Sequence, residues 1–232
     1  INGLFDANRS RVPVLAIASH IPLAEIGSGY FQETHPQDLF QECSVYCELV
    51  SDASQLPWVL EAAMRAAISL RGVAVVVVPG DVFFREAPGR RPSAPIRAAA
   101  SHVVPGEQDL RAAASILNDA KKVTILAGAG VAGAHAEVLA LAERLQAPIV
   151  HALRGKPHIE HDNPFDVGMT GLLGFASGYR AMERCDALLM LGTDFPYRQF
   201  FPEKARIVQV DIRGSQLGRR TPIDAGLVGD VK

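Results

Sequence analysis

The stretch Val123–Gly133, with the sequence VTILAGAGVAG, constrains the fold of this chain more than any other feature. A mostly apolar run with β-branched residues leads directly into Gly128, Gly130 and Gly133, and helical periodicity follows over His135–Leu145. This order is typical of nucleotide-binding α/β domains, because glycines let the backbone turn sharply and approach a phosphate at the start of the next helix. The stretch therefore predicts a parallel sheet with a candidate phosphate-binding turn.

The second strand of that domain argues against a standard NAD site. In such a site an acidic residue stands about 20 residues beyond the glycines and binds the ribose. The next predicted strand, Pro148–Leu153, leads instead to Arg154, Gly155 and Lys156, and no carboxylate stands there. The sequence favours a nucleotide site of another kind.

The composition is that of an ordinary soluble globular protein, with 48% hydrophobic and 21% charged residues. The net charge of −2 argues against nucleic acid as a partner, because surfaces that bind nucleic acid carry an excess of basic residues. Cys43, Cys47 and Cys185 are too few for a disulfide framework and are interpreted as small buried hydrophobes. No apolar run reaches the roughly 18–20 residues of a membrane span, so a cytoplasmic location is expected.

Residues 1–82 are predicted to form a parallel α/β domain that is truncated at its N-terminus. The sequence begins with Ile1, and residues 1–10 have the spacing of a helix interior, so we expect it to start inside a longer protein. Val14–Ala18 is expected to be a strand buried on both faces, followed by a functional loop over residues 19–31. The remaining predicted elements are helices over Pro36–Glu42 and Ser54–Ser69 and strands over Tyr46–Leu49 and Val73–Val78.

Residues 83–106 are predicted to be an interdomain linker, because the prolines between Arg85 and Pro105 occur without any periodicity. Residues 107–232 are predicted to form a second domain in which strands and helices alternate. The predicted fold class is thus α/β, with two doubly wound parallel-sheet domains. The predicted elements of the second domain are helices Gln108–Asn118, His135–Leu145 and Tyr179–Arg184 and strands Val123–Ala127, Ile149–Leu153, Ala187–Leu191, Arg206–Val210 and Leu227–Val228.

Loops at the carboxyl ends of the second domain's strands are expected to converge on one crevice. These loops are residues 128–133, 154–156 and 192–198, and the small-residue loop 168–178 lies between the last two in sequence. Each side chain taken alone has a simpler interpretation, such as a turn residue or a core residue. Taken together, their placement predicts a flat ligand that bears phosphate and ribose. The side chains that carry this prediction are Thr170, Phe175, Thr193, Phe195, Tyr197 and Asp211.

Other chemistry-bearing residues form no recognisable site. His158 and His161 stand beside acidic residues, but their turn-rich context and the lack of further ligands favour a solvated loop over a metal site. A Ser-His-Asp triad is not predicted, because no Gly-x-Ser-x-Gly turn is present. Spacing alone does not pair the acidic residues near Phe31, which are Glu25, Glu33 and Asp38.

Five longer stretches resemble one family of enzymes over essentially the whole chain. They are IPLAEIGSGYFQETHPQDLFQECSVYCELV (21–50), VVVVPGDV (75–82), PIVHALRGK (148–156), NPFDVGMTGLLGF (163–175) and LGTDFPYRQFFP (191–202). They resemble the thiamine-diphosphate-dependent pyruvate oxidases and quinone-linked pyruvate dehydrogenases. The resemblance implies that residues 1–82 are the C-terminal half of a pyrimidine-binding domain. It also implies that residues 107–232 are a central FAD-binding domain, incomplete at its C-terminus.

The resemblance also implies which residues contribute to the chemistry. Phe31 and Gln32 match catalytic positions that face the thiazolium ring and the substrate, with Phe31 as an apolar wall for the methyl group of pyruvate. FAD is expected to lie above the glycine turn of residues 128–133. The residues expected to hold it are Gly128, Gly130, Gly133, Thr170, Gly171, Leu172, Leu173, Thr193, Asp194, Phe195, Pro196, Tyr197 and Asp211.

The implied reaction is the oxidative decarboxylation of pyruvate to acetate and CO2, with electrons passed through FAD to a quinone such as ubiquinone. Thiamine diphosphate and Mg²⁺ are expected in a longer homotetrameric protein. Its activating glutamate would precede Ile1, and Val82 follows Gly80-Asp81 where the family's metal motif would need a second glycine. The chain alone is therefore expected to be inactive. Peripheral contact with the inner face of the cell membrane is expected only through a C-terminal segment that is not in this sequence.

The sequence leaves two other functions open. An acetolactate synthase-like carboligase of the same family would also keep FAD in its central domain. A non-catalytic nucleotide-binding fragment would fit the absence of the catalytic motifs.

Overall fold

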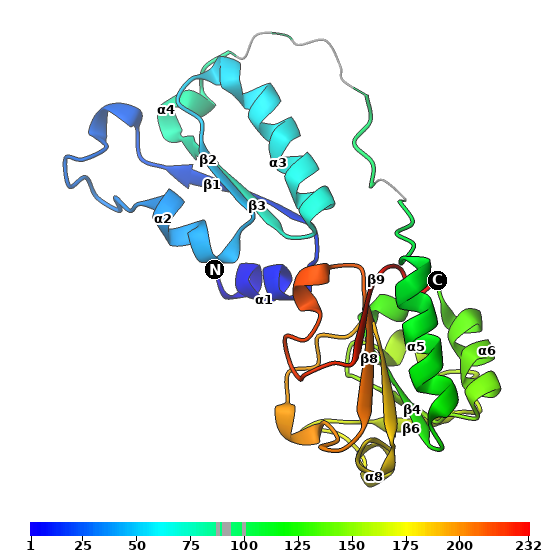
Figure 1. Cartoon of the computed structure of the whole chain (residues 1–232). Coiled ribbons are helices and arrows are strands. Elements are labelled where there is room, and N and C mark those ends of the chain that lie inside the picture. The colour runs from blue at the N-terminus through cyan, green and yellow to red at the C-terminus, as the bar shows by residue number, and fades with distance from the viewer. Residues whose placement is uncertain (87–88, 90–93, 99–100) are drawn as a thin grey trace. The chain divides into compact units, whose positions relative to one another are not determined.

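The computed structural model describes residues 1–86, 89, 94–98 and 101–232, and the chain divides into two compact units, Ile1–Ala100 and Ser101–Lys232 (Figure 1). Each unit contains one sheet in which all paired strands are parallel. The predicted α/β fold class is confirmed. The predicted linker spans the division between the units, and residues 87–88, 90–93 and 99–100 of it lie outside the described residues.

The first unit is built on a three-stranded sheet in the order β1-β3-β2. Its strands are β1 (Val14–His20), β2 (Tyr46–Leu49) and β3 (Val73–Pro79). All seven residues of β3 are buried, because this central strand is covered on both faces. The valine run that predicted a fully buried strand is confirmed.

Helices cover both faces of this sheet. On one face, α3 (Leu56–Leu70) buries Val59, Ala63 and Ala67, and the 3-10 turn directly before it begins with a capping box between Asp52 and Gln55. On the other face, side chains of α1 (Asn2–Ser10) and α2 (Pro36–Phe40) pack against the valines of β3. The short helix α4 (Gly80–Phe83) follows β3 directly.

The expectation that Val14–Ala18 is buried on both faces is wrong. Alternate residues of β1 are accessible, and the side chains of Leu15 and Ile17 are 36% and 56% exposed. Because β1 is the edge strand, α3 covers the β3 side chains beside it more completely than it covers β1. Apolar composition alone did not distinguish an edge strand from a central one.

The second unit has a six-stranded sheet in the order β6-β5-β4-β7-β8-β9. From β4 the chain moves outward to β6, and it then returns to the centre and continues outward from β7 on the other side. This is the strand order of the doubly wound dinucleotide-binding fold, with its switch point between β4 and β7. The strands are β4 (Val123–Ala127), β5 (Ile149–His151), β6 (Asp166–Met169), β7 (Ala187–Leu191), β8 (Arg206–Asp211) and β9 (Ala225–Val228).

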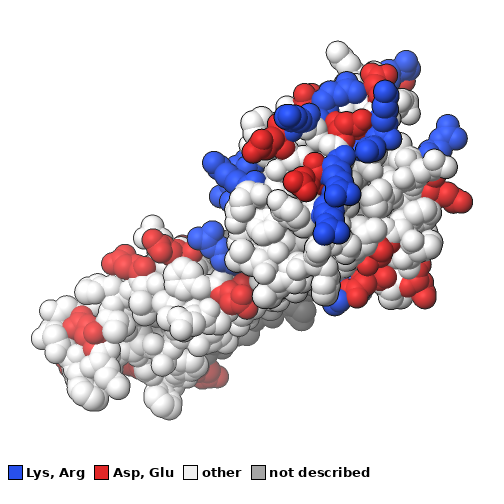
Figure 2. All heavy atoms as spheres, turned by 90° about the horizontal axis from the view of Figure 1, so that it is seen from below, with Lys and Arg blue, Asp and Glu red and all other residues white. Residues whose placement is uncertain are grey.

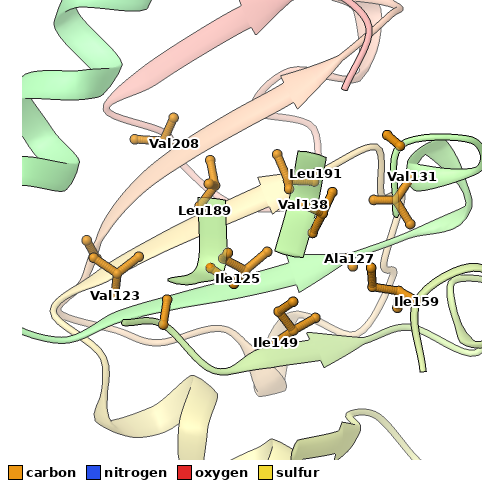
Figure 3. Close-up of a cluster of buried hydrophobic side chains, with 14 of the residues drawn as sticks. Val123, Ile125, Ala127, Val131, Val138, Ile149, Ile159, Leu189, Leu191 and Val208 are labelled. Atoms are coloured by element: carbon orange, nitrogen blue, oxygen red, sulfur yellow. The ribbon is translucent and has the colours of Figure 1, made fainter. Parts of the chain in front are cut away.

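Helices α5 (Glu107–Asp119) and α6 (His135–Leu145) pack on one face of this sheet and α8 (Ala176–Arg184) on the other. Figure 3 shows the first of these cores, where Val138 of α6 lies over strand residues such as Ile125 and Leu189. Among the described residues, no helix is both long and apolar enough to cross a bilayer. The short 3-10 helices are η1 (Leu23–Glu25), η2 (Gln41–Cys43), η3 (Ala53–Gln55), η4 (Ala129–Val131), η5 (Arg198–Phe200) and η6 (Gly214–Gln216).

The region between residues 152 and 176 differs from the prediction. It was expected to be turns and loop, but it contains the four-residue helix α7 (Lys156–Ile159) and strand β6. The sequence of β6, DVGM, is too short to predict a strand by itself and contains a glycine, and it is a strand because it pairs with β5 at the sheet edge. The strand β5 also ends at His151 rather than at Leu153.

At the switch point, the loops after β4 and β7 touch through their backbones. The N–H of Gly130 donates to the carbonyl of Gly192 at 2.9 Å. A Cβ atom on Gly128 would lie 2.4 Å from the carbonyl oxygen of Gly192, and one on Gly130 would lie 2.6 Å from its Cα. These glycines are therefore required by the approach of two loops, whatever else they bind.

We predict that Gly128→Ala destabilises the second unit by about 1–3 kcal/mol, because its methyl group would overlap backbone that cannot move aside. Gly133→Asn is the matched control: a Cβ there meets nothing within 4 Å, and Asn tolerates the positive φ of 79° at this position. Scanning calorimetry of both variants makes the comparison. Equal melting temperatures for the two variants would contradict the steric argument.

Candidate functional site

The loops after β4, β6 and β7 lie together at the carboxyl edge of the second sheet. Gly130 packs on Gly192, and a Cβ atom on Gly171 would be 3.1 Å from the ring of Phe195 and 3.5 Å from that of Tyr197. Gly155, in the loop after β5, packs equally closely on the carbonyl of Ala127 at the end of β4. The loop segments expected to form one crevice are thus neighbours in the structure.

Two threonines stand at strand ends of this edge with their side chains buried. Thr170, directly after β6, and Thr193, in the loop after β7, are each 3% exposed. The N–H of Thr170 donates to the carbonyl of His151 at 3.2 Å, but its Oγ1 is buried and has no hydrogen-bond partner in the structure. An unsatisfied buried hydroxyl costs about 1–3 kcal/mol, which a ligand at this edge would relieve.

The carboxylate of Asp211 closes β8 and is 4% exposed. Its Oδ1 accepts a hydrogen bond from the backbone N–H of Arg213 at 2.9 Å and lies 3.4 Å from the Nε of that arginine. Asp211 is therefore held in one orientation by its own turn, so the turn interpretation and the ligand interpretation are compatible.

Asp194 belongs to a second network beside it. Its Oδ1 accepts from Nε of Arg220 at 2.9 Å. With the amide of Gln216 oriented so that its nitrogen faces Asp194, Gln216 donates to Oδ1 at 3.2 Å and accepts from Arg219 and Arg213 at 3.0 and 3.2 Å. Figure 2 shows one face of the molecule, and in the upper right part of that view basic and acidic side chains alternate.

The apolar residues expected at the site divide into accessible and buried ones. Leu172, Leu173 and Phe175 are 66%, 74% and 59% exposed, so they can cover a flat ring. Phe195 is only 4% exposed and contacts the rings of Tyr197, Phe200 and Phe201 edge-on. The ring of Phe195 is a core group, so any contact from this residue to a ligand would come from its backbone.

In the first unit, Phe31 and Gln32 project from a loop that a carboxylate organises. Phe31 is 81% exposed, and Gln32 has a left-handed backbone with φ of 65°. Glu33 accepts hydrogen bonds from the N–H groups of Gly27, Gly29 and Tyr30 at 2.5, 2.7 and 3.2 Å. These bonds, the one from Gly27 foremost, lower the pKa of the Glu33 carboxyl. Glu33 is thus a structural anchor for the loop rather than an acid paired with a neighbour.

A pocket of about 120 Å³ lies at the carboxyl edge of the first sheet, between the strand ends and the start of α2. His20, His35 and Asp38 are among its lining residues, whereas Phe31 and Gln32 are not. Sequence reasoning passed over both histidines. The available signal for His20 was its place directly after an apolar strand, where parallel sheets commonly carry function.

A second group that sequence reasoning missed is buried at the β5–β6 edge. The Nε2 of His151 lies 3.5 Å from Oδ1 of Asp166 and 3.6 Å from Oε2 of Glu160, and the imidazole is 1% exposed. Burial raises the pKa of Asp166. The hydrogen bond from Lys156 lowers the pKa of Glu160. The signal was a single histidine in an otherwise apolar strand.

Within the described ranges, no three His, Cys, Asp or Glu side chains are grouped so that they could hold a metal ion. The side chain of His161 is 71% exposed. Its backbone carbonyl lies 3.0 Å from the ring Nε2 of His135, which is hydrogen-bond distance. Cys43 and Cys185 are buried, as expected, whereas Cys47 is only partly buried, and burial raises the pKa of Cys185 to about 11. That thiol is protonated and unreactive near neutral pH.

Comparison with known proteins shows similarity to one family of enzymes. Residues 110–232 match the family model described as thiamine pyrophosphate enzyme, central domain. An uncharacterised 42.6 kDa protein in the isoamylase 3′ region of Pseudomonas amyloderamosa is 63% identical over 232 residues, which is 100% of this chain and 59% of that protein. The Bacillus subtilis protein named "Putative thiamine pyrophosphate-containing protein YdaP" is 39% identical over 232 residues, covering 99% and 40% of the two chains.

Acetolactate synthase isozyme 1 large subunit of Escherichia coli is 30% identical over 242 residues, covering 100% of this chain and 42% of that protein. The chain thus spans between 40% and 59% of the length of these three relatives.

We predict that Glu33→Gln loosens the loop over residues 26–33, because a neutral amide accepts three backbone N–H groups less well than a carboxylate does. The measurement is the hydrogen-exchange protection of the Gly27, Gly29 and Tyr30 amides. Glu25→Gln, at the end of η1 directly before this loop, is the control.

The pH dependence of this protection has a definite sign. A carboxyl whose folded pKa is lowered stabilises the fold above its ordinary value of 4.5, and this contribution is lost as the pH falls through the folded pKa. The wild-type loop should therefore lose protection in acid, whereas Glu33→Gln should change little. Identical pH profiles for the two proteins would refute the anchoring role.

Proposed function

The chain belongs to the thiamine pyrophosphate enzyme family, and from that premise we propose that it is part of an enzyme that decarboxylates pyruvate oxidatively, with FAD held by its second unit. The observation that carries the FAD proposal is the cluster of buried polar groups at one sheet edge. Thr170, Thr193 and Asp211 end three different strands or begin the loops after them, and Oγ1 of Thr170 lacks a partner. In doubly wound sheets this edge is where nucleotides bind.

The residues present fit a flavin nucleotide in kind. Asp211 would accept hydrogen bonds from ribose hydroxyls, and the two threonines would form hydrogen bonds with polar groups of the ligand. Leu172, Leu173 and Phe175 are accessible apolar side chains on the same loop as Thr170, so they would cover a flat ring and exclude water from it. When bound, FAD would supply two-electron acceptance, and thiamine diphosphate the electron sink for decarboxylation.

In the first unit, Phe31 and Gln32 are the residues proposed to face the substrate. Phe31 presents an accessible ring, which would shield the methyl group of pyruvate from water. The loop anchored by Glu33 would hold both side chains in place. The resemblance assigns the main contacts to thiamine diphosphate and Mg²⁺ to segments that this sequence does not contain.

Further parts of the proposal come from the sequence resemblance alone. They are pyruvate as substrate, a quinone as electron acceptor, a homotetrameric assembly, and a cytoplasmic location with peripheral contact at the inner face of the membrane.

A second function in the same family is a carboligase. It is favoured by the relative named acetolactate synthase, which matches the whole of this chain at 30% identity. Analysis of the products from pyruvate separates the two in a protein that contains this chain. Acetate and CO2 with a reduced acceptor support the oxidative reaction, and acetolactate without net reduction supports the carboligase. A protein that binds FAD and forms neither product would be a nucleotide-binding module.

We predict that the chain, mixed with FAD and desalted, retains the flavin absorption band. Asp211→Asn should weaken binding about tenfold or more, because the amide replaces a charged acceptor for ribose hydroxyls. Asp119→Asn is the matched control, since Asp119 lies at the end of α5, before the amino end of β4. Titration of flavin fluorescence gives the dissociation constants. A folded chain that retains no flavin would rule out the FAD site.

A further inference from the structure

The proposed function does not use the group of His151, Asp166, Glu160 and Lys156, in which the His151 ring is buried and the other three side chains reach the surface to different extents. The Nε2 of the His151 ring faces the carboxylates of both Asp166 and Glu160 at ion-pair distance. Both ring nitrogens are buried without a hydrogen-bond partner in the described structure, and so is the facing oxygen of Asp166, Oδ1. The two carboxylates come from different elements, since Asp166 begins β6 and Glu160 follows α7.

The charges in this group identify the nitrogen that carries a proton. Lys156 forms an ion pair with Glu160 and balances it, which leaves the imidazole of His151 as the group facing Asp166. If Nε2 were bare, its lone pair would face two carboxylate oxygens inside the protein, which is repulsive. The geometry therefore requires a proton on Nε2, in either the neutral or the charged imidazole.

The contact of His151 with Asp166 and Glu160 lies beside the loop that is proposed to bind the ligand. β6 is the edge strand and pairs with β5 alone, and the register shifts between Ile149 and His151. The carbonyl of His151 accepts the N–H of Thr170, the first residue after β6. A four-residue edge strand with an irregular register has few backbone bonds to hold it, so a side-chain tie to β5 and α7 matters for its position.

We propose that His151 is a positioning residue: its buried Nε2, which faces the carboxylates of Glu160 and Asp166 at 3.6 and 3.5 Å, carries a proton whose attraction to both carboxylates holds β6 near β5 and so sets the loop Thr170–Leu173 for ligand binding. The part that concerns the ligand rests on the proposed function. The role is indirect, because the imidazole acts through Asp166 and through the strand that carries Thr170. The proposed role depends on one proton, the one that Nε2 of the buried His151 ring carries.

The proton is tested first, by ¹H–¹⁵N correlation spectroscopy of the histidine rings in the wild-type chain. The expected signal for His151 near neutral pH is that of a protonated Nε2. A ring protonated at Nδ1 alone would overturn the proposal. This measurement needs no variant and no ligand.

Matched variants then test the positioning role. In His151→Gln the amide nitrogen stands near the place of Nε2, whereas in His151→Asn it stands near that of Nδ1. We expect Gln to keep the FAD dissociation constant within about threefold of wild type and Asn to raise it about tenfold. The protection of the Thr170 amide against hydrogen exchange should follow the same order.

Equal values for the two variants would overturn the proposal. If the wild-type chain binds no FAD, the proposed function fails, but the protection of the Thr170 amide still separates the two variants. If both variants unfold, the ring spectrum of the wild type decides the question.

Discussion

The close backbone contact between the loops after β4 and β7 is the constraint on which the second unit depends. Gly128 and Gly130 meet Gly192 and Thr193 at distances that leave no room for a side chain. This contact lies at the switch point, where the two halves of the sheet meet, and it fixes the positions of the loops after β4 and β7 relative to each other. The glycines were first expected to make room for a phosphate. The contact shows that they are needed even without one, because a side chain on either would overlap the facing loop.

Around this contact, the carboxyl edge of the sheet gathers polar groups that burial makes expensive. Thr170, Thr193 and Asp211 are nearly inaccessible, and Oγ1 of Thr170 has no hydrogen-bond partner in the described structure. His151 extends the same pattern one strand further out. Natural domains keep few unsatisfied buried polar atoms, so their concentration at one edge distinguishes it from the rest of the unit. Family membership agrees with this position, since the matched central domain covers the same residues.

Strongly periodic or fully apolar segments were predictable from the sequence. The helix His135–Leu145 and the strand Tyr46–Leu49 have the expected bounds, and β3 is buried throughout. Strand β6 was missed because its four residues include a glycine and are too few for a pattern, and its pairing with β5 cannot be read from them. In the candidate site, the convergence of loops followed from topology. The burial of Phe195 and the pairing of His151 with Asp166 depend on tertiary packing, which residue spacing does not encode.

The edge strand β1 has a consequence for how the first unit behaves in solution. Its accessible Leu15 and Ile17 lie on a strand whose outer side carries no ladder partner in the described sheet. Such an edge is a template on which another extended segment can add, and aliphatic side chains along it favour that addition. Addition at this edge would join the first units of separate molecules, and a higher protein concentration would favour it.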